Sequence, residues 1–219
     1  MQMLVSTPAG EARVTRFPAA DSRRAALVLG HGAGGGIEAP DLQALAASLP
    51  AAGVEVVLVE QPWRVAGKRL APAPKTLDVA WRPVIESLRV DVFKGEVGRD
   101  ADVPLIVGGR SAGARVACRT GLDTEASAVL ALAFPLHPPG KPEKSRAEEL
   151  LGSGLPTLIV QGAVDPFGTP AEFPELPDGH ELVALPAGGH EFAVRKSQEP
   201  VLGLVTEAVA AWIERLLAQ

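Results

Sequence analysis

Short apolar runs alternate with amphipathic stretches along the whole chain, and this alternation constrains the fold more than any other feature. The strongest runs are apolar throughout, not only at every second position; they cover residues 25–30, 54–59, 103–108, 128–134 and 157–161, and a weaker one covers 181–185. Strands that are apolar on both faces are typical of a parallel sheet covered by helices. The chain is therefore expected to form a mostly parallel sheet.

Helices and a terminal hairpin complete this prediction. Two further strands are expected at 3–7 and 12–17, joined by a Pro-Ala-Gly turn. The helices are expected at 41–49, 76–92, 112–120, 144–151 and 200–217. Repeated strand–helix alternation predicts an α/β domain with right-handed crossovers and helices on both faces of the sheet. Because no linker divides the chain, residues 1–219 are expected to form a single domain.

Composition narrows the class of protein. The 219 residues are 47% hydrophobic and 21% charged, which predicts a folded, water-soluble chain. A net charge of −5 argues against nucleic acid as a partner. Cys118 is the single cysteine and is expected to be a buried small residue. Without an apolar stretch of about 20 residues or a signal-peptide pattern at the start, we expect a cytoplasmic protein that does not bind membranes.

The sequence Gly109-Arg110-Ser111-Ala112-Gly113 follows one predicted strand and opens the next helix. A serine on such a sharp turn needs small residues two positions before and after it, and Gly109 and Gly113 meet this requirement. The turn exposes the hydroxyl at a helix amino terminus, where free N–H groups favour a developing oxyanion. Ser111 is thus the candidate nucleophile; the alternative is a glycine-rich turn with a passive serine.

A serine hydroxyl needs a base, and the base needs an orienting group. His190 follows the last predicted strand after two glycines, whereas His180 precedes that strand and is expected at the opposite end of the sheet. Asp165 comes at the end of the penultimate predicted strand and is the candidate acid. Glu191 ranks below Asp165 because neighbours in an extended loop point apart. The alternative for His190 is a solvated loop histidine, and the alternative for Asp165 is an aspartate that only starts a turn.

These residues occur in the order Ser111, Asp165, His190, each on a loop after a strand, and here the sequence resembles the α/β-hydrolase superfamily. The sequence resembles specifically the small members of this superfamily, such as the dienelactone hydrolases and the predicted hydrolases of the testis-expressed and chromatin-complex-subunit type. Four segments between residues 25 and 217 carry the resemblance: 31–34, 109–113, 161–168 and 188–192. It implies an eight-strand α/β-hydrolase fold and a Ser-Asp-His triad, but it says little about the substrate.

The resemblance also implies an oxyanion hole made of backbone N–H groups. The N–H of Ala112 is one expected donor, and the His-Gly pattern at residues 31–32 makes Ala33 the choice for the second, with Gly32 or Gly34 as alternatives. His31 is then expected to form structural hydrogen bonds. Many hydrolases insert a cap domain between the strand after the nucleophile helix and the strand of the acid. In this sequence only residues 135–155 separate those two strands, so we expect no large cap domain and an open site.

Several residues are candidates for substrate binding. The basic loop 61–75 either overhangs the site or is solvated, and Arg110 either binds substrate or braces a loop. The candidate substrate-binding residues are Arg110, His137, Trp63, Arg64 and Phe167.

Two other classes of function compete with a hydrolase. Residues Gly30 to Gly35 satisfy G-x-G-x-x-G, and Glu60 ends the next predicted strand, as in a dinucleotide-binding protein. Against this, Pro40 suits the first turn of a helix that starts too late. The second competitor is a hydrolase fold that only binds a partner, although a scaffold would not need all three residues.

The sequence therefore predicts a serine hydrolase that cleaves a carboxylic ester or thioester of a small substrate through an acyl-enzyme on Ser111. An ester is favoured over an amide because its leaving group is easier to expel. No cofactor is expected, and no metal, since the histidines are scattered and lack ligand spacing. The oligomeric state stays open.

Overall fold

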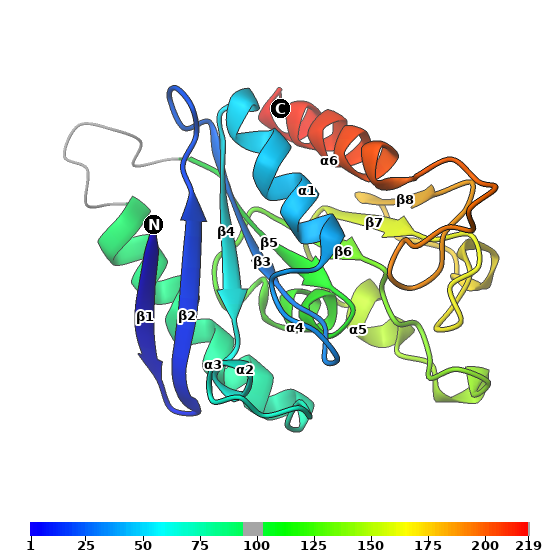
Figure 1. Ribbon diagram of the computed structural model, residues 1–219, viewed down its shortest axis with the longest axis horizontal. Helices are drawn as coiled ribbons and strands as arrows, with labels where there is room; N and C mark the ends of the chain where they lie inside the picture. Colours follow the sequence, from blue (N-terminus) through cyan, green and yellow to red (C-terminus); the bar gives the residue numbers. More distant parts are fainter. Residues whose placement is uncertain (94–102, 219) are drawn as a thin grey trace.

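The computed structural model describes residues 1–93 and 103–218, in which eight strands form one sheet in the order β1-β2-β4-β3-β5-β6-β7-β8 (Figure 1). The strands are β1 (Gln2–Thr7), β2 (Gly10–Phe17), β3 (Ala25–Gly30), β4 (Val54–Glu60), β5 (Leu105–Arg110), β6 (Ala128–Leu132), β7 (Thr157–Gln161) and β8 (His180–Ala184). Strand β2 runs antiparallel to both of its neighbours, β1 and β4, and the other adjacent strands of this sheet are parallel. The expected mostly parallel sheet is confirmed, and its strand order is that of an α/β-hydrolase fold.

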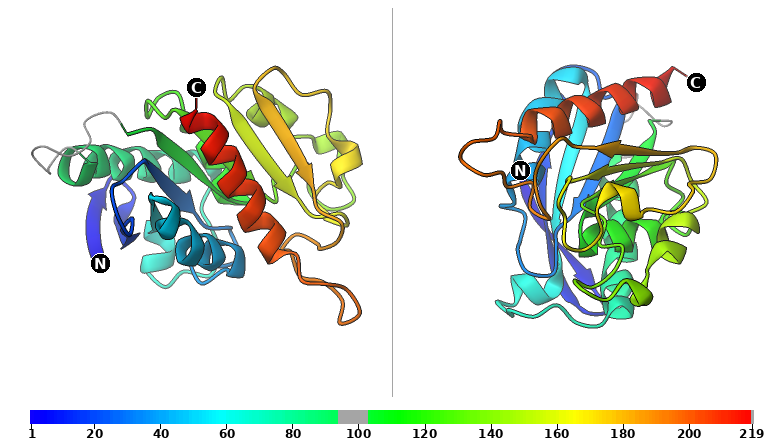
Figure 2. Two further views of the ribbon diagram at one scale, coloured as in Figure 1. Left: turned by 90° about the horizontal axis from the view of Figure 1, so that it is seen from above. Right: turned by 90° about the vertical axis from the view of Figure 1, so that its right-hand side faces the viewer.

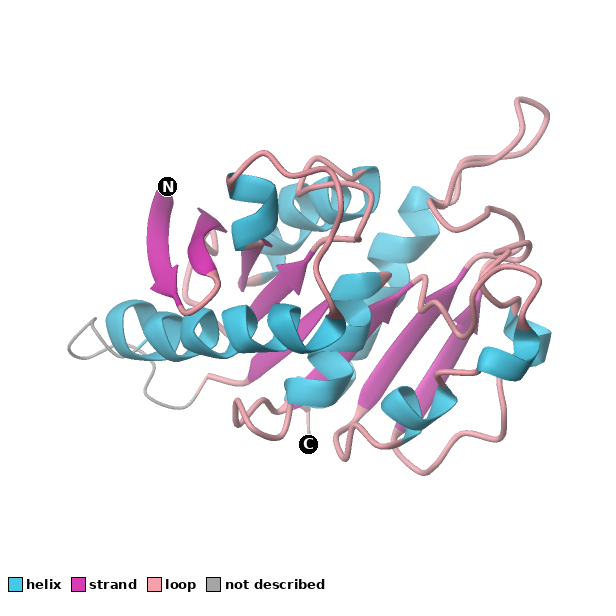
Figure 3. Cartoon of the chain, turned by 90° about the horizontal axis from the view of Figure 1, so that it is seen from below, coloured by secondary structure: helices cyan, strands magenta, loops and turns pink. Residues whose placement is uncertain are grey.

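Helices cover both faces of the sheet. One face carries α1 (Pro40–Ser48) and α6 (Leu202–Leu217), which lie side by side (Figure 2). The other face carries α3 (Pro74–Ser87), α4 (Ala112–Thr120) and α5 (Ala147–Leu151) (Figure 3). Short helices are η1 (Leu49–Ala52), α2 (Pro62–Val65), η2 (Leu88–Phe93), η3 (Pro142–Lys144) and η4 (Pro170–Glu172).

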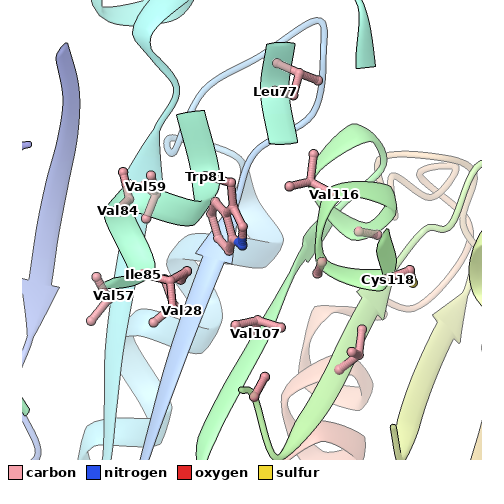
Figure 4. Packing of buried hydrophobic residues seen from close by; sticks show 14 of the residues in the cluster. Val28, Val57, Val59, Leu77, Trp81, Val84, Ile85, Val107, Val116 and Cys118 are labelled. Carbon is pink, nitrogen blue, oxygen red and sulfur yellow. The ribbon is translucent and has the colours of Figure 1, made fainter. Parts of the chain in front are cut away.

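The central strands are apolar on both sides because each side is buried against helices. In β3 all six residues are buried; Val28 belongs to the core under α3 and α4, and Leu27 to the core under α1 and α6. Figure 4 shows the Trp81 side chain extending from α3 into the first of these cores. A Cβ on Gly30 would lie 3.3 Å from this ring. Cys118 is buried in the same core, and burial raises its pKa to about 12, so its thiol stays protonated.

Several boundaries differ from those that the sequence predicted. Strand β5 continues to Arg110 and so ends directly at Ser111, whereas β6 stops at Leu132 because Ala133 adopts a left-handed backbone with φ 45°. The helix expected at 144–151 is two pieces, η3 and α5. The helix α2, which places Trp63 inside the basic loop, was not predicted.

The predicted helix at 76–92 also changes form near its end. Its α-helical part, α3, starts at Pro74 and ends at Ser87, after which the chain continues as the π-helical segment η2. The first two residues predicted for the strand at 103–108 lie outside β5.

Candidate active site

Ser111 occupies the turn between β5 and α4 with φ 54° and ψ −112°, a backbone conformation that is unfavourable for a residue with a side chain. Its own N–H donates to the Leu132 carbonyl of β6 at 2.9 Å, which anchors the turn to the neighbouring strand. A Cβ on either Gly109 or Gly113 would collide with the Gly30 carbonyl oxygen at the end of β3. The small residues therefore let the turn pack directly against the central strand.

The loops after β7 and β8 run together at the same end of the sheet. The N–H of Val164 donates to the Gly188 carbonyl at 3.1 Å, and a Cβ on Gly162 would collide with that same oxygen. At the tip of the second loop, the Phe192 N–H donates to the Gly189 carbonyl at 3.0 Å. This turn carries His190 back toward the carboxyl end of β5.

Three side chains meet there. His190 Nε2 lies 2.8 Å from Ser111 Oγ, and its Nδ1 lies 2.8 Å from Asp165 Oδ2. The structure thus brings together the three residues that the sequence singled out as nucleophile, base and acid, within hydrogen-bond distance of one another.

Asp165 is held firmly by its surroundings. Its side chain is fully buried; Oδ1 accepts the Phe167 N–H at 2.8 Å, and Oδ2 accepts a hydrogen bond from Gln161 Nε2 at 2.9 Å as well as facing His190. The Phe167 ring lies 4.2 Å from the His190 ring, centre to centre. The imidazole is consequently fixed by the carboxylate at one nitrogen and by an aromatic neighbour on its face.

Arg110, the residue before the serine, links three elements. Its Nε donates to Asp41 Oδ2 on α1 at 3.1 Å, and its terminal nitrogen donates to the His190 carbonyl at 2.8 Å. Both side chains of this ion pair are almost completely buried, and burial raises the pKa of Asp41 despite the opposing effect of the guanidinium. Of the two roles considered for Arg110, these contacts match bracing of the histidine loop.

The loop after β3 and the start of α4 carry the two candidate backbone donors. Ala112 is the first residue of α4, and Ala33 lies in the exposed loop after β3; within the described residues neither N–H donates a hydrogen bond to another backbone group. The two loops approach closely, since a Cβ on Gly32 would lie 3.5 Å from Ser111 Cβ. These free N–H groups are available to a ligand oxygen.

An open cavity of about 410 Å³ lies over Ser111 and His190. It is lined by residues 32–35 and by Arg110, Ala112, Arg115, Pro135, Arg146, Phe167 and Glu191. Sequence reasoning missed Arg115 and Arg146. Arg115 follows Ser111 by four positions, so helical spacing could have placed it on the same face of α4. Nothing in the local sequence pointed to Arg146.

Three of the candidate substrate-binding residues do not line this cavity. His137 bonds to the Pro138 carbonyl and to Glu172, and Arg64 forms an ion pair with Glu38. Trp63 is buried beside His31 and faces a separate cavity of about 350 Å³ between α2 and the β1–β2 turn. Phe167 and Arg110 do line the cavity.

His31 bonds only to backbone. Its Nδ1 lies 2.8 Å from the Gly32 carbonyl oxygen, and its Nε2 accepts the Gln61 N–H at 3.1 Å. Burial lowers its pKa, which favours the neutral ring that this pair of bonds requires. His31 therefore holds the loop after β3 against the start of α2.

A second serine–histidine pair lies at the other end of the sheet. Ser153 Oγ is 3.1 Å from His180 Nε2, and the same ring nitrogen is 3.1 Å from the Leu150 carbonyl oxygen. Ser153 is buried, and it also bonds to Thr157. Among the described residues no carboxylate contacts this imidazole, so the pair ties α5 to β7 and β8.

The geometry of the glycine-rich loop does not match a dinucleotide fingerprint. Gly35 lies in the loop, five residues before α1 begins at Pro40, so it is not inside the helix as the fingerprint requires. Glu60, the residue considered for ribose binding, forms an ion pair with Arg13 at 3.1 Å.

Two features are absent from the described residues. No group of three or more histidine, cysteine, aspartate or glutamate side chains there could hold a metal ion. No helix there is long and apolar enough to cross a membrane.

Together, the sheet order and the serine turn define an α/β hydrolase. A family model described as an alpha/beta hydrolase domain matches residues 23–216, so the chain belongs to this family. Comparison with curated proteins by sequence found no match.

Solved structures share the fold at low identity. A dienelactone hydrolase from Anabaena variabilis is 18% identical with a TM-score of 0.72, covering 98% of this chain and 96% of that one. A serine hydrolase without a lid from Xanthomonas campestris is 20% identical with a TM-score of 0.67, covering 97% and 94%. Est1E from Butyrivibrio proteoclasticus is 15% identical with a TM-score of 0.73, covering 100% and 99%.

Proposed function

We propose that the protein is a serine hydrolase that cleaves a carboxylic ester or thioester of a small substrate, with residues 1–219 acting as one domain. The observation that carries this proposal is the relay of two 2.8 Å contacts from Ser111 through His190 to Asp165. Family membership and the esterase and hydrolase neighbours support the reaction class. The proposal needs no cofactor, because the nucleophile, base and electrostatic groups are all side chains or backbone of this chain.

In the first half-reaction, Ser111 Oγ attacks the substrate carbonyl carbon while His190 Nε2 takes its proton. Asp165 keeps the other ring nitrogen protonated and stabilises the imidazolium. The negative charge that develops on the carbonyl oxygen is stabilised by the N–H groups of Ala33 and Ala112. Collapse of the intermediate breaks the bond to the alcohol or thiol, which leaves with the proton from His190.

In the second half-reaction, water attacks the acyl group on Ser111. His190 takes a proton from this water, and the second tetrahedral intermediate expels the serine, which recovers that proton. The products are a carboxylic acid and free enzyme. The longest element described between β6 and β7 is the five-residue α5, which is too short to form a cap. The site is therefore open, which supports a small substrate.

The direct test is hydrolysis of p-nitrophenyl acetate by the wild type and by Ser111→Ala. We expect kcat/KM to fall by about 10⁴-fold or more in the variant, because the acyl-enzyme can no longer form. Ser153→Ala is the matched control: it removes the other serine that contacts a histidine, and it should leave kcat/KM within about threefold. Equal turnover by wild type and Ser111→Ala, at the same melting temperature, would refute the proposal.

A further inference from the structure

The cavity over Ser111 is lined by three arginines, and only two of them have carboxylate partners. Arg110 pairs with Asp41, and Arg115 pairs with Glu149. Arg146 donates one hydrogen bond to the Pro135 carbonyl at 3.1 Å. In the described part of the chain no carboxylate lies within 4.0 Å of its guanidinium.

The nearby acids are already committed to other cations. Glu149 bonds to both Arg115 and Arg119, and Arg119 also pairs with Asp78. This network leaves Arg146 as a half-buried cation that forms no ion pair with a described residue. Its burial and the neighbouring Arg115 lower its pKa, and the more distant charge of Glu149 opposes this only in part. Burying a charge costs free energy unless a partner offsets it.

Glu191 is the other charged group on the cavity wall. It lies on the His190 loop, is exposed to solvent, and forms no ion pair with a described residue. Its charge is hydrated and opposes the binding of an anion. The lining therefore combines one half-buried cation that lacks a partner with one solvated acid.

We propose that Arg146 binds a carboxylate of the substrate, so that the ester or thioester cleaved at Ser111 carries a second, anionic group. The guanidinium uses one of its five N–H donors on Pro135, which leaves a planar set of donors that matches a carboxylate. Because both groups line one cavity, a single small molecule can contact Arg146 while its ester carbonyl lies at Ser111. This inference rests on the proposed function for the reacting bond.

The kinetic test compares matched substrates. One pair carries the charge on the acyl side: the p-nitrophenyl monoester of glutaric acid and the same ester with its free carboxyl methylated. A second pair carries it on the leaving group: 4-acetoxybenzoate and its methyl ester. In at least one pair we expect the wild type to prefer the anion in kcat/KM by about tenfold or more, chiefly through KM.

Variants test whether Arg146 causes the preference for the anionic ester over the neutral one. Arg146→Gln should reduce the preference to about one, because the guanidinium that distinguishes the two esters is gone. Arg146→Lys should keep part of the preference, and the exposed Lys144→Gln, outside the cavity, should keep all of it. Glu191→Gln should increase the preference, because it removes the opposing charge. Using the ratio of two substrates cancels any effect of a variant on the serine or histidine.

A binding measurement separates this inference from the proposed function. Calorimetry on Ser111→Ala should show about tenfold tighter binding of the preferred anionic ester than of its methylated form, and adding Arg146→Gln should abolish the difference. Cleavage of neutral esters through Ser111 with no anion preference in either pair would overturn the inference alone. An anion preference in binding without cleavage of any ester would overturn the proposed function alone.

Discussion

His31 and His190 carry the same imidazole, but their partners give them different chemistry. His31 bonds at both nitrogens to backbone groups, so its proton has no reacting partner. His190 contacts a hydroxyl at one nitrogen and a carboxylate at the other, which is the arrangement of a base that can accept a proton and be stabilised when charged. The difference lies in position on the sheet edge and not in residue type.

The lowered pKa of His31 predicts a pH-dependent stability. Because the folded ring resists protonation, the unfolded chain binds more protons once the pH falls below the ordinary value of 6.5. The contribution of His31 should therefore lower the stability of the wild type between pH 7.5 and 5.5. His31→Gln, which keeps one polar group for the backbone, should lose less stability over this interval. Urea unfolding at both pH values measures the difference.

The other three histidines are present in both proteins, so their contributions cancel in this comparison. An identical pH dependence in wild type and His31→Gln would contradict the assignment of a buried, neutral ring. The Lys144→Gln variant gives a matched surface control.

Residues on the loops after strands were the most predictable. Ser111, Asp165 and His190 could be proposed together because the carboxyl ends of parallel strands meet at one edge of a sheet. Arg146 could not, since its approach to the cavity depends on a break between η3 and α5 within a segment that reads as one helix. Trp63 and Arg64 are turned from the cavity by α2, a four-residue helix too short to give a periodic signal.

At the scale of elements, the close packing of the serine turn against the end of β3 depends on three glycines, Gly30, Gly109 and Gly113. Gly113 lies in α4 with ordinary helical geometry, yet its position directly against the Gly30 carbonyl leaves no room for a methyl group. The cost of a side chain there is steric, and it is separate from any backbone preference.

We predict that Gly113→Ala lowers the free energy of unfolding by about 2–3 kcal/mol, because the added methyl group pushes α4 away from β3. The same displacement should reduce esterase activity by moving Ser111. Gly35→Ala is the matched control: its Cβ would meet open space, so its stability should stay within about 0.5 kcal/mol of wild type. If urea unfolding gave Gly113→Ala the same free energy of unfolding as the wild type, the close contact with Gly30 would not exclude a methyl group at residue 113.

Element ends were less predictable than element types. The expected sheet was found because its central strands are apolar on both faces, a pattern that leaves few alternatives. The observed ends differ from the predicted ones where backbone conformation determines the end of a strand. Strand β6 ends before the left-handed Ala133, and β8 begins at His180, one residue before the apolar run. Neither event changes hydrophobicity, so the pattern does not record it.

At the scale of the whole molecule, the site exists only when the sheet is complete. Ser111 follows β5, Asp165 follows β7 and His190 follows β8, while the loop carrying Ala33 follows β3. Helices α1 and α6 pack on one face of these strands, and α3, α4 and α5 pack on the other (Figures 2 and 3). The proposed nucleophile therefore depends on the assembled fold, and not on the glycine-rich turn alone.

The measurement that tests this account most directly is reaction with a fluorophosphonate probe, followed by intact mass and peptide mapping. We expect one adduct per chain, on Ser111, absent in Ser111→Ala and formed at least about 100-fold more slowly in His190→Ala. No adduct on the folded wild-type protein, or an adduct on Ser153 in place of Ser111, would contradict it.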